Sequence, residues 1–325
     1  MPDLPFAAEA LQVSACPVIL YIHGNCAYNT CTMHRYFRTI GFSEYHNEEE
    51  VRHLLDVVQQ QNEPRAMIIN RSNGDRLWEI RAELGPGLGV ILSGYVNHLG
   101  QLVRERYMPF FEEKELTSDV YCSIQRHVDN NVFSGLLDDI RVGISLIFRL
   151  TNAGEYMQRR QRGQNLNPRG VSLTAFSRDG KILLPIKKDA KMREKARVAD
   201  QNREKLIEAA RHGDESAIEA LNNEDMGMYN SLTRRMMKED IYSIVESCFM
   251  PQGIECDIYQ IIGDILEIST RRNLLTGEDI WDFLIQTNDL PIHVVTNQID
   301  LQGEPEVGRR FKGTVWIQGK ALFEN

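Results

Sequence analysis

The stretch GRRFKGTVWIQG, residues 308–319, decides the fold because it alternates apolar and polar side chains as a half-buried strand does. One predicted face holds Phe311, Gly313, Val315 and Ile317, and the other holds Lys312, Thr314, Trp316 and Gln318. We expect the first face to line the interior of a small barrel. The stretch is therefore predicted to be mainly a closing strand.

The outer face of this strand carries Trp316, one of three tryptophans in the chain. A tryptophan there either packs against a neighbouring helical segment or offers a stacking platform to a ligand. Packing is favoured, because nearby Glu304 and Glu306 disfavour nucleic acid. A partner of the C-terminal part is nevertheless predicted to contact Arg309, Arg310, Lys312 and Trp316.

Three further strand-like segments precede it, at residues 257–270, 277–287 and 290–297. Four strands in so short a stretch favour a small closed or nearly closed barrel. We therefore predict an OB-like barrel domain over residues 251–325, after a boundary at Pro251 and Gly253.

The N-terminal half begins its regular patterning with a helix. Asn47 and Glu50 resemble a capping box. One apolar helix face then follows at helical spacing, formed by Val51, Leu54, Leu55 and Val58. We expect this helix to end before Pro64.

Strand-like segments then recur with turns at intervals of roughly 8 to 12 residues, which favours an antiparallel sheet over βαβ units. The predicted strands lie at 66–70, 75–84, 87–96, 101–111, 119–128, 140–150, 170–176 and 181–186. Asp179-Gly180 between the last two predicts a hairpin. Residues 33–186 are thus interpreted as a mostly antiparallel α+β domain with a flanking helix.

The period becomes helical and highly charged from residue 187 to residue 250. Helices are predicted over 187–211, 214–221, 224–238 and 240–248, with Asp214 as a cap. The fold class is therefore α+β: a sheet domain, a central charged helical segment and a small β-barrel.

Charge is segregated along the chain, whose formal net charge is −9. Residues 141–211 hold 17 Lys and Arg against 7 Asp and Glu. A polar stretch at 155–170, interpreted as a loop, and the segment after it supply the candidate polyanion contacts: Arg159, Arg160, Arg162, Arg169, Lys187, Lys188 and Lys191. Nucleic acid could bind there. A solvated helix facing an acidic neighbour is the favoured interpretation, because acidic residues are interspersed.

Residues 1–32 have no clear period and hold three of the six cysteines. Either translation starts at Met33, which we favour, or the segment is an arm with one strand at 18–22. The spacing of its cysteines fits no usual zinc pattern. No apolar run reaches the about 18 residues of a membrane helix, and no secretory signal is present. We expect a cytoplasmic protein with free thiols at Cys122, Cys248 and Cys256.

Motifs of known chemistry are missing from the sequence. It has no Walker A sequence and no nucleophile elbow. The glycine-rich run at 85–89 leads into a strand, so a hairpin turn is expected there and no phosphate cradle. His46 and His53 lie seven apart on the first helix and are expected at its surface. We expect no catalytic, cofactor-binding or metal-ligating residue.

Four stretches resemble a known family. They are CFMPQGIECDIYQIIGDI at 248–265, DLQGEPEVGRRFKGTVWIQG at 300–319, MHRYFRTIGFSEY at 33–45 and VGISLIFRLTNAGEY at 142–156. From Met33 onward the chain is similar to a family from clostridial bacteria called domain of unknown function 3881. The resemblance implies a cytoplasmic bacterial protein and no catalytic residue.

Three functional hypotheses follow. The favoured one is a non-catalytic protein that acts through protein or ligand contacts. The first alternative is binding of RNA or single-stranded DNA through the basic region at 141–211. The second is an enzyme whose site is assembled from residues far apart in the sequence.

Overall fold

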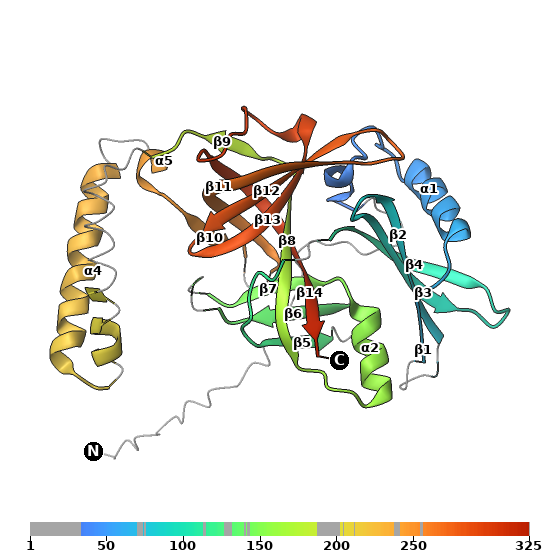
Figure 1. Cartoon of the computed structure of the whole chain (residues 1–325), viewed down its shortest axis with the longest axis horizontal. Helices are drawn as coiled ribbons and strands as arrows, with labels where there is room; N and C mark the ends of the chain where they lie inside the picture. The colour runs from blue at the N-terminus through green and yellow to red at the C-terminus, as the bar shows by residue number, and fades with distance from the viewer. Residues whose placement is uncertain are drawn as a thin grey trace, which may run out of the picture.

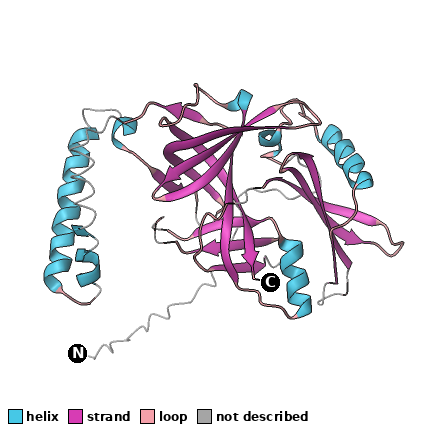
Figure 2. Cartoon of the chain, in the orientation of Figure 1, coloured by secondary structure: helices cyan, strands magenta, loops and turns pink. Residues whose placement is uncertain are grey.

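The protein folds into two β-sheets with few helices (Figures 1 and 2). The computed structural model describes residues 34–69, 74, 76–112, 115–126, 132–139, 141, 144–186, 202–203, 205–210, 212–236, 241–253 and 256–324. The predicted leader at 1–32 and the predicted contacts Lys187, Lys188 and Lys191 lie outside the described residues. The α+β class is confirmed.

The smaller sheet is an antiparallel sheet of four strands in sequential order. These are β1 (Ala66–Ile69), β2 (Arg76–Gly85), β3 (Leu88–Val96) and β4 (Leu102–Phe111). The tight turn between β2 and β3 confirms the hairpin expected at the glycine-rich run, with Gly87 at a positive φ of 69°. That conformation suits glycine, which has no Cβ.

Helix α1 (Glu48–Gln61) covers one face of this sheet (Figure 1). Its predicted cap is confirmed, because the Asn47 side chain accepts a hydrogen bond from the Glu50 amide at 2.9 Å. The four predicted apolar residues are all buried, and the helix ends before Pro64. His46 and His53 are exposed, as expected.

The larger sheet contains ten strands. They are β5 (Cys122–Arg126), β6 (Phe133–Leu137), β7 (Leu146–Leu150), β8 (Pro168–Ser177), β9 (Lys181–Leu183), β10 (Cys248–Pro251), β11 (Ile258–Arg272), β12 (Asp279–Thr287), β13 (Leu290–Asn297) and β14 (Arg310–Phe323). Pairings β11–β12, β12–β13, β13–β8, β8–β14 and β14–β11 close a ring.

This ring differs from the predicted OB-like barrel, which is not confirmed. One of its strands is β8, which comes from the region predicted to be the first domain. Beyond the ring the same sheet continues through β7, β6 and β5. The predicted division at residues 186 and 251 therefore does not coincide with the boundary between the two sheets.

Strand β14 joins the two sides of the ring in the large sheet, because it pairs with both β11 and β8. Residues 310–316 pair with β11, and residues 317–323 pair with β8. The predicted alternation is confirmed, since Phe311, Val315 and Ile317 lie in the core inside the ring. Trp316 points to the opposite face, into a second core.

The second core lies between the two sheets and beneath α1. Trp316 is 0% exposed there and stacks on Tyr36, with ring centroids 5.3 Å apart. Packing is thus observed for Trp316, as favoured. Its partners come from the N-terminal region and from Phe176 of β8, however, and not from the helical segment as expected.

The Asp179-Gly180 hairpin prediction is wrong. Strands β8 and β9 both pair antiparallel with β14, so they run in the same direction. Asp179 accepts a hydrogen bond from the Thr314 amide at 3.1 Å, across the break between them. A Cβ on Gly180 would lie 2.7 Å from the Phe311 ring. The dipeptide therefore marks a close backbone approach, the other common role of glycine in strands.

Residues 155–162 are helical and residues 168–170 belong to β8, which corrects the loop predicted over 155–170. Helix α2 (Ala153–Arg162) ends at Gly163, whose left-handed φ of 67° gives the usual C-terminal cap. Basic residues in the last turn also suit the negative end of the helix dipole. Strand β6 was not predicted at all.

The central segment contains α4 (Glu215–Met236) and α5 (Ile241–Ile244). The predicted cap at Asp214 is confirmed, since its carboxylate accepts hydrogen bonds from the Ser216 and Ala217 amides. Two other predictions are wrong: α4 continues through residues 221–224, and the last helix ends before Cys248, where β10 begins. Helix α4 stands apart from both sheets (Figure 1).

Two further features concern the described residues. None of their helices has the length and apolar character needed to cross a membrane. Cys122, Cys248 and Cys256 are free thiols, as expected.

The substitution Trp316→Ala tests the junction between the two cores. We expect it to lower the free energy of unfolding by about 3 to 5 kcal/mol, because it removes a fully buried aromatic side chain. Urea unfolding monitored by circular dichroism measures this. Trp281→Ala, at a partly exposed tryptophan of β12, is the control and should cost less. Equal losses for the two variants would contradict the central position of Trp316.

Candidate functional site

The basic residues predicted to form a contact surface do not converge. Arg160, Arg162 and Arg169 are exposed at the end of α2 and just beyond it. Arg159 is half-buried, and it bonds Glu155 at 3.1 Å and the Glu324 carbonyl at 2.7 Å.

The second predicted group lies at the start of β14, whereas α2 lies beside the end of that strand. Arg310 is buried and donates to the main-chain carbonyls of Leu184, Tyr242 and Val245. Lys312 contacts the Tyr242 ring, and Arg309 pairs with Glu306 at 2.9 Å. Arg310 and Lys312 thus attach β9 and α5 to the sheet.

Buried and partly buried polar side chains instead gather on the two sheet faces that oppose each other. On the large sheet, strand register places His293, Thr174, Gln318 and Arg149 in one row across β13, β8, β14 and β7. Thr174, Gln318 and Arg149 are only 5%, 1% and 7% exposed. On the small sheet, Glu79, Ser93 and Arg106 form a matching row across β2, β3 and β4.

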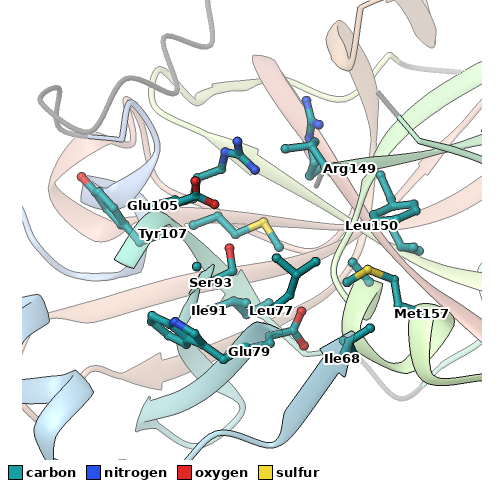
Figure 3. A pocket seen from close by; sticks show the side chains of 17 residues that line it. Ile68, Leu77, Glu79, Ile91, Ser93, Glu105, Tyr107, Arg149, Leu150 and Met157 are labelled. Atoms are coloured by element: carbon teal, nitrogen blue, oxygen red, sulfur yellow. The ribbon is translucent and has the colours of Figure 1, made fainter. Parts of the chain in front are cut away.

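A cavity of about 60 Å³ lies between the small-sheet row and Arg149, the end of the large-sheet row (Figure 3). Its polar lining includes Glu79, Ser93, Glu105, Arg106 and Arg149. Its apolar lining includes Ile68, Leu77, Ile91, Phe133, Leu150 and Met157. The cavity has room for a few water molecules or a small ligand group.

Glu79 is the central polar residue of this cavity. Its Oε2 accepts a hydrogen bond from the Gly154 amide in the first turn of α2, at 3.1 Å. The Asn152 side chain forms no capping bond, so Glu79 takes its place at this helix end. A Cβ on Gly154 would lie 2.7 Å from Glu79 Oε1, so glycine allows the helix to dock on the carboxylate.

Burial raises the pKa of Glu79 to about 7, although the Gly154 amide and the charge of Arg81 both act to lower it. Within the described residues Glu79 forms no ion pair. Arg81 pairs instead with Glu112 at 3.2 Å and lies over the Phe110 ring. The carboxyl therefore changes its charge near neutral pH, which is unusual for a glutamate.

Arg149 closes the opposite side of the cavity. Its guanidinium bonds Asp257 at 3.2 Å, and the same carboxylate accepts from the Trp316 indole at 2.9 Å. Burial and the charge of Arg149 lower the pKa of nearby His34 to about 3, so that this histidine is neutral at physiological pH. The cavity is thus joined to the core beneath Trp316.

A second, smaller cavity of about 10 Å³ lies beside Gln318. The Gln318 amide donates to the Pro109 carbonyl at 2.6 Å, while its buried oxygen has no partner among the described residues. The space suits a single water molecule, which would satisfy that oxygen. This cavity is too small for any larger ligand.

Sequence reasoning missed the whole site. Alternation does place Leu77, Glu79 and Arg81 on one face of β2. In sequence that face looks like the solvent side, because the other holds Trp78, Ile80 and Ala82. The strand β7 and the helix α2 that cover it come about 70 residues later.

Comparison with known proteins gives one match. The family described as "Domain of unknown function, E. rectale Gene description (DUF3881)" matches residues 37–319. The chain belongs to this family. No curated protein matches the chain, and no solved structure matches it. The region matched to domain of unknown function 3881 includes every residue that lines the larger cavity.

Metal binding has no support in the part of the chain that the structure describes. No group of three or more His, Cys, Asp or Glu side chains is arranged there to hold a metal ion. Burial raises the pKa of the Cys122 thiol to about 11, so this cysteine is protonated. The chemistry available to the cavity is therefore that of carboxylate, hydroxyl and guanidinium groups.

Glu79→Gln should make stability less dependent on pH. The pKa of Glu79 is raised in the fold, so the wild-type protein loses stability as pH rises from the unfolded value near 4.5 toward 7. We expect the variant to be more stable by roughly 2 to 3 kcal/mol at about pH 8 and nearly equal at about pH 4. Urea unfolding across this pH range measures the difference.

Glu83→Gln is the matched control, since Glu83 lies on the same strand and is exposed. It should change stability little at any pH. A constant difference between Glu79→Gln and wild type across the pH range would show that Glu79 does not titrate near 7.

Proposed function

We propose that the protein is a non-catalytic binding protein whose site is the cavity between the two sheets. The observation that supports this is the gathering of partly buried and buried polar side chains around one cavity. They come from three strands of one sheet and one strand of the other. Such a space, mostly apolar with a few convergent polar groups, is the usual form of a small-molecule site.

The cost of these polar groups supports a role in binding. A polar group removed from water without compensation costs roughly 1 to 3 kcal/mol in proteins. Elsewhere the facing surfaces of the sheets pack Trp316, Phe176 and Ile280 against apolar residues. Apolar side chains at the cavity would make the fold more stable than the polar side chains found there. Binding of a ligand accounts for the presence of these polar side chains.

Binding accounts for the cavity better than catalysis does. Neither histidine nor cysteine is among the described residues that line it. In that part of the chain Ser93 therefore has no histidine beside it to activate it as a nucleophile. Oε2 of Glu79 already accepts a hydrogen bond from the Gly154 amide.

A cavity-filling substitution tests this function. We expect ethylammonium, ethanol and acetate, screened by ¹⁵N–¹H NMR, to include at least one that shifts the amides of Ser93, Leu150 and Gly154. Ser93→Val should abolish that shift, because it fills the cavity with a residue that suits a strand. Ser123→Val on β5, away from the cavity, is the matched control and should retain it. No shift with any of the three probes would contradict the proposal.

Nucleic-acid binding is a second candidate, supported by the exposed Arg160, Arg162 and Arg169. It predicts that single-stranded RNA binds at low salt and that affinity falls steeply as salt rises. Changing the three arginines to glutamate should abolish binding, measured by fluorescence anisotropy. Changing the exposed Arg52, Arg178 and Arg272 to glutamate is the matched control. Equal affinity for both triple variants would rule this candidate out.

A further inference from the structure

The cavity's chemistry points to one class of ligand, an inference that rests on the proposed function. We infer that the cavity binds a short primary alkylammonium ion through Glu79 and Ser93. Its alkyl chain lies against the apolar wall formed by Leu77, Ile91 and Leu150. The following paragraphs give the geometric, electrostatic and steric reasons.

Glu79 and Ser93 provide hydrogen-bond acceptors at adjacent positions. They are directly paired across β2 and β3, so their side chains lie side by side on one face. Both residues line the cavity, with the Glu79 carboxylate beside Leu77 and the Ser93 hydroxyl directed toward the side of Glu105 (Figure 3). An ionised carboxylate has about four acceptor sites, and the Gly154 amide takes one. An ammonium group has three donors, which the remaining sites and the Ser93 hydroxyl can accept.

Charge favours a cation at this position. Arg81, the nearest positive charge on β2, pairs with Glu112. Arg149 on β7 pairs with Asp257. Glu105 and Arg106 on β4 also line the cavity, and their opposite charges add no net charge to it. An ammonium ion would supply the counter-charge that Glu79 lacks among the described residues, and removal from water strengthens the pairing.

Size and shape limit the ligand to a few atoms. A cavity of about 150 Å³ accommodates benzene, so one of about 60 Å³ accommodates roughly two or three non-hydrogen atoms. Ethylammonium has three. A small carboxylate of similar size would place its charge against Glu79. Ethanol could bond there but would leave the carboxylate without a counter-ion.

Affinity should depend on pH in a defined direction. An alkylamine, like the lysine side chain, stays protonated up to about pH 10. Glu79 has a pKa of about 7 in the ligand-free fold, so it is mostly neutral below that pH. The other charged groups that line the cavity are Glu105, Arg106 and Arg149. Affinity for the ammonium ion should therefore rise with pH between about 6 and 8.

The experiment compares ethylammonium, ethanol and acetate by ¹⁵N–¹H NMR titration at about pH 8 and about pH 6. Gly154 is the reporter, because its amide donates to Glu79. We expect ethylammonium to bind most tightly at about pH 8 and roughly tenfold more weakly at about pH 6, where about a tenth of Glu79 is ionised. Glu79→Gln should abolish the preference for the ammonium ion, and Glu83→Gln should leave it unchanged.

The outcomes separate this inference from the proposed function. If ethanol or acetate binds as tightly as ethylammonium and Ser93→Val abolishes that binding, the cavity is a binding site and the ammonium inference is wrong. If none of the three probes shifts Gly154, both the inference and the proposed function are wrong. Ser93→Ala provides a second test that does not alter charge: it should weaken ethylammonium binding severalfold, and unchanged affinity would overturn the role of Ser93.

Discussion

The backbone pairing of β14 is the constraint on which the rest of the fold depends. This strand pairs with β11 along its first half and with β8 along its second, and it also contacts β9 and β7. With both edges occupied, β14 lies in the interior of the sheet. Side chains on one of its faces fill the ring, and side chains on the other face, including Trp316, are covered by a second layer. The small sheet and α1 provide that layer.

The outer face of β14 changes from apolar to polar along its length, and the smaller cavity lies beside its polar part. Trp316 belongs to the apolar core between the layers, whereas Gln318 and Lys320, two and four residues later, are polar. Polar groups between two sheets must keep hydrogen-bond partners. At that level Gln318 bonds the Pro109 carbonyl and Lys320 bonds Glu112. The larger cavity lies beside the neighbouring strand β7, between Arg149 and Glu79.

Local patterns in the sequence predicted the elements well but not their partners. The capping box at Asn47 and the alternation at 311–317 depend on neighbours within a few residues, so sequence shows them. The parallel pairing of β13 with β8 joins residues such as His293 and Thr174, which no local pattern relates. Because of that pairing, the ring of strands includes β8 and differs from the predicted barrel. Helix α2 was missed because its arginines and flanking asparagines look like a loop, and the missing helix concealed the cover over Glu79.

Glu79 shows why the candidate site could not be inferred from residue type alone. It and Glu83 are glutamates on one strand, yet only Glu79 has α2 docked on it. Its ionisation has two opposing consequences: the charge strengthens the hydrogen bond to the Gly154 amide and also increases the cost of burial. A bound cation offsets the cost of burying the charge and keeps the stronger hydrogen bond to the Gly154 amide. Ligand binding, the position of α2 and the stability of the fold are therefore coupled through one carboxylate, and the stabilisation follows the ratio of ligand concentration to its dissociation constant.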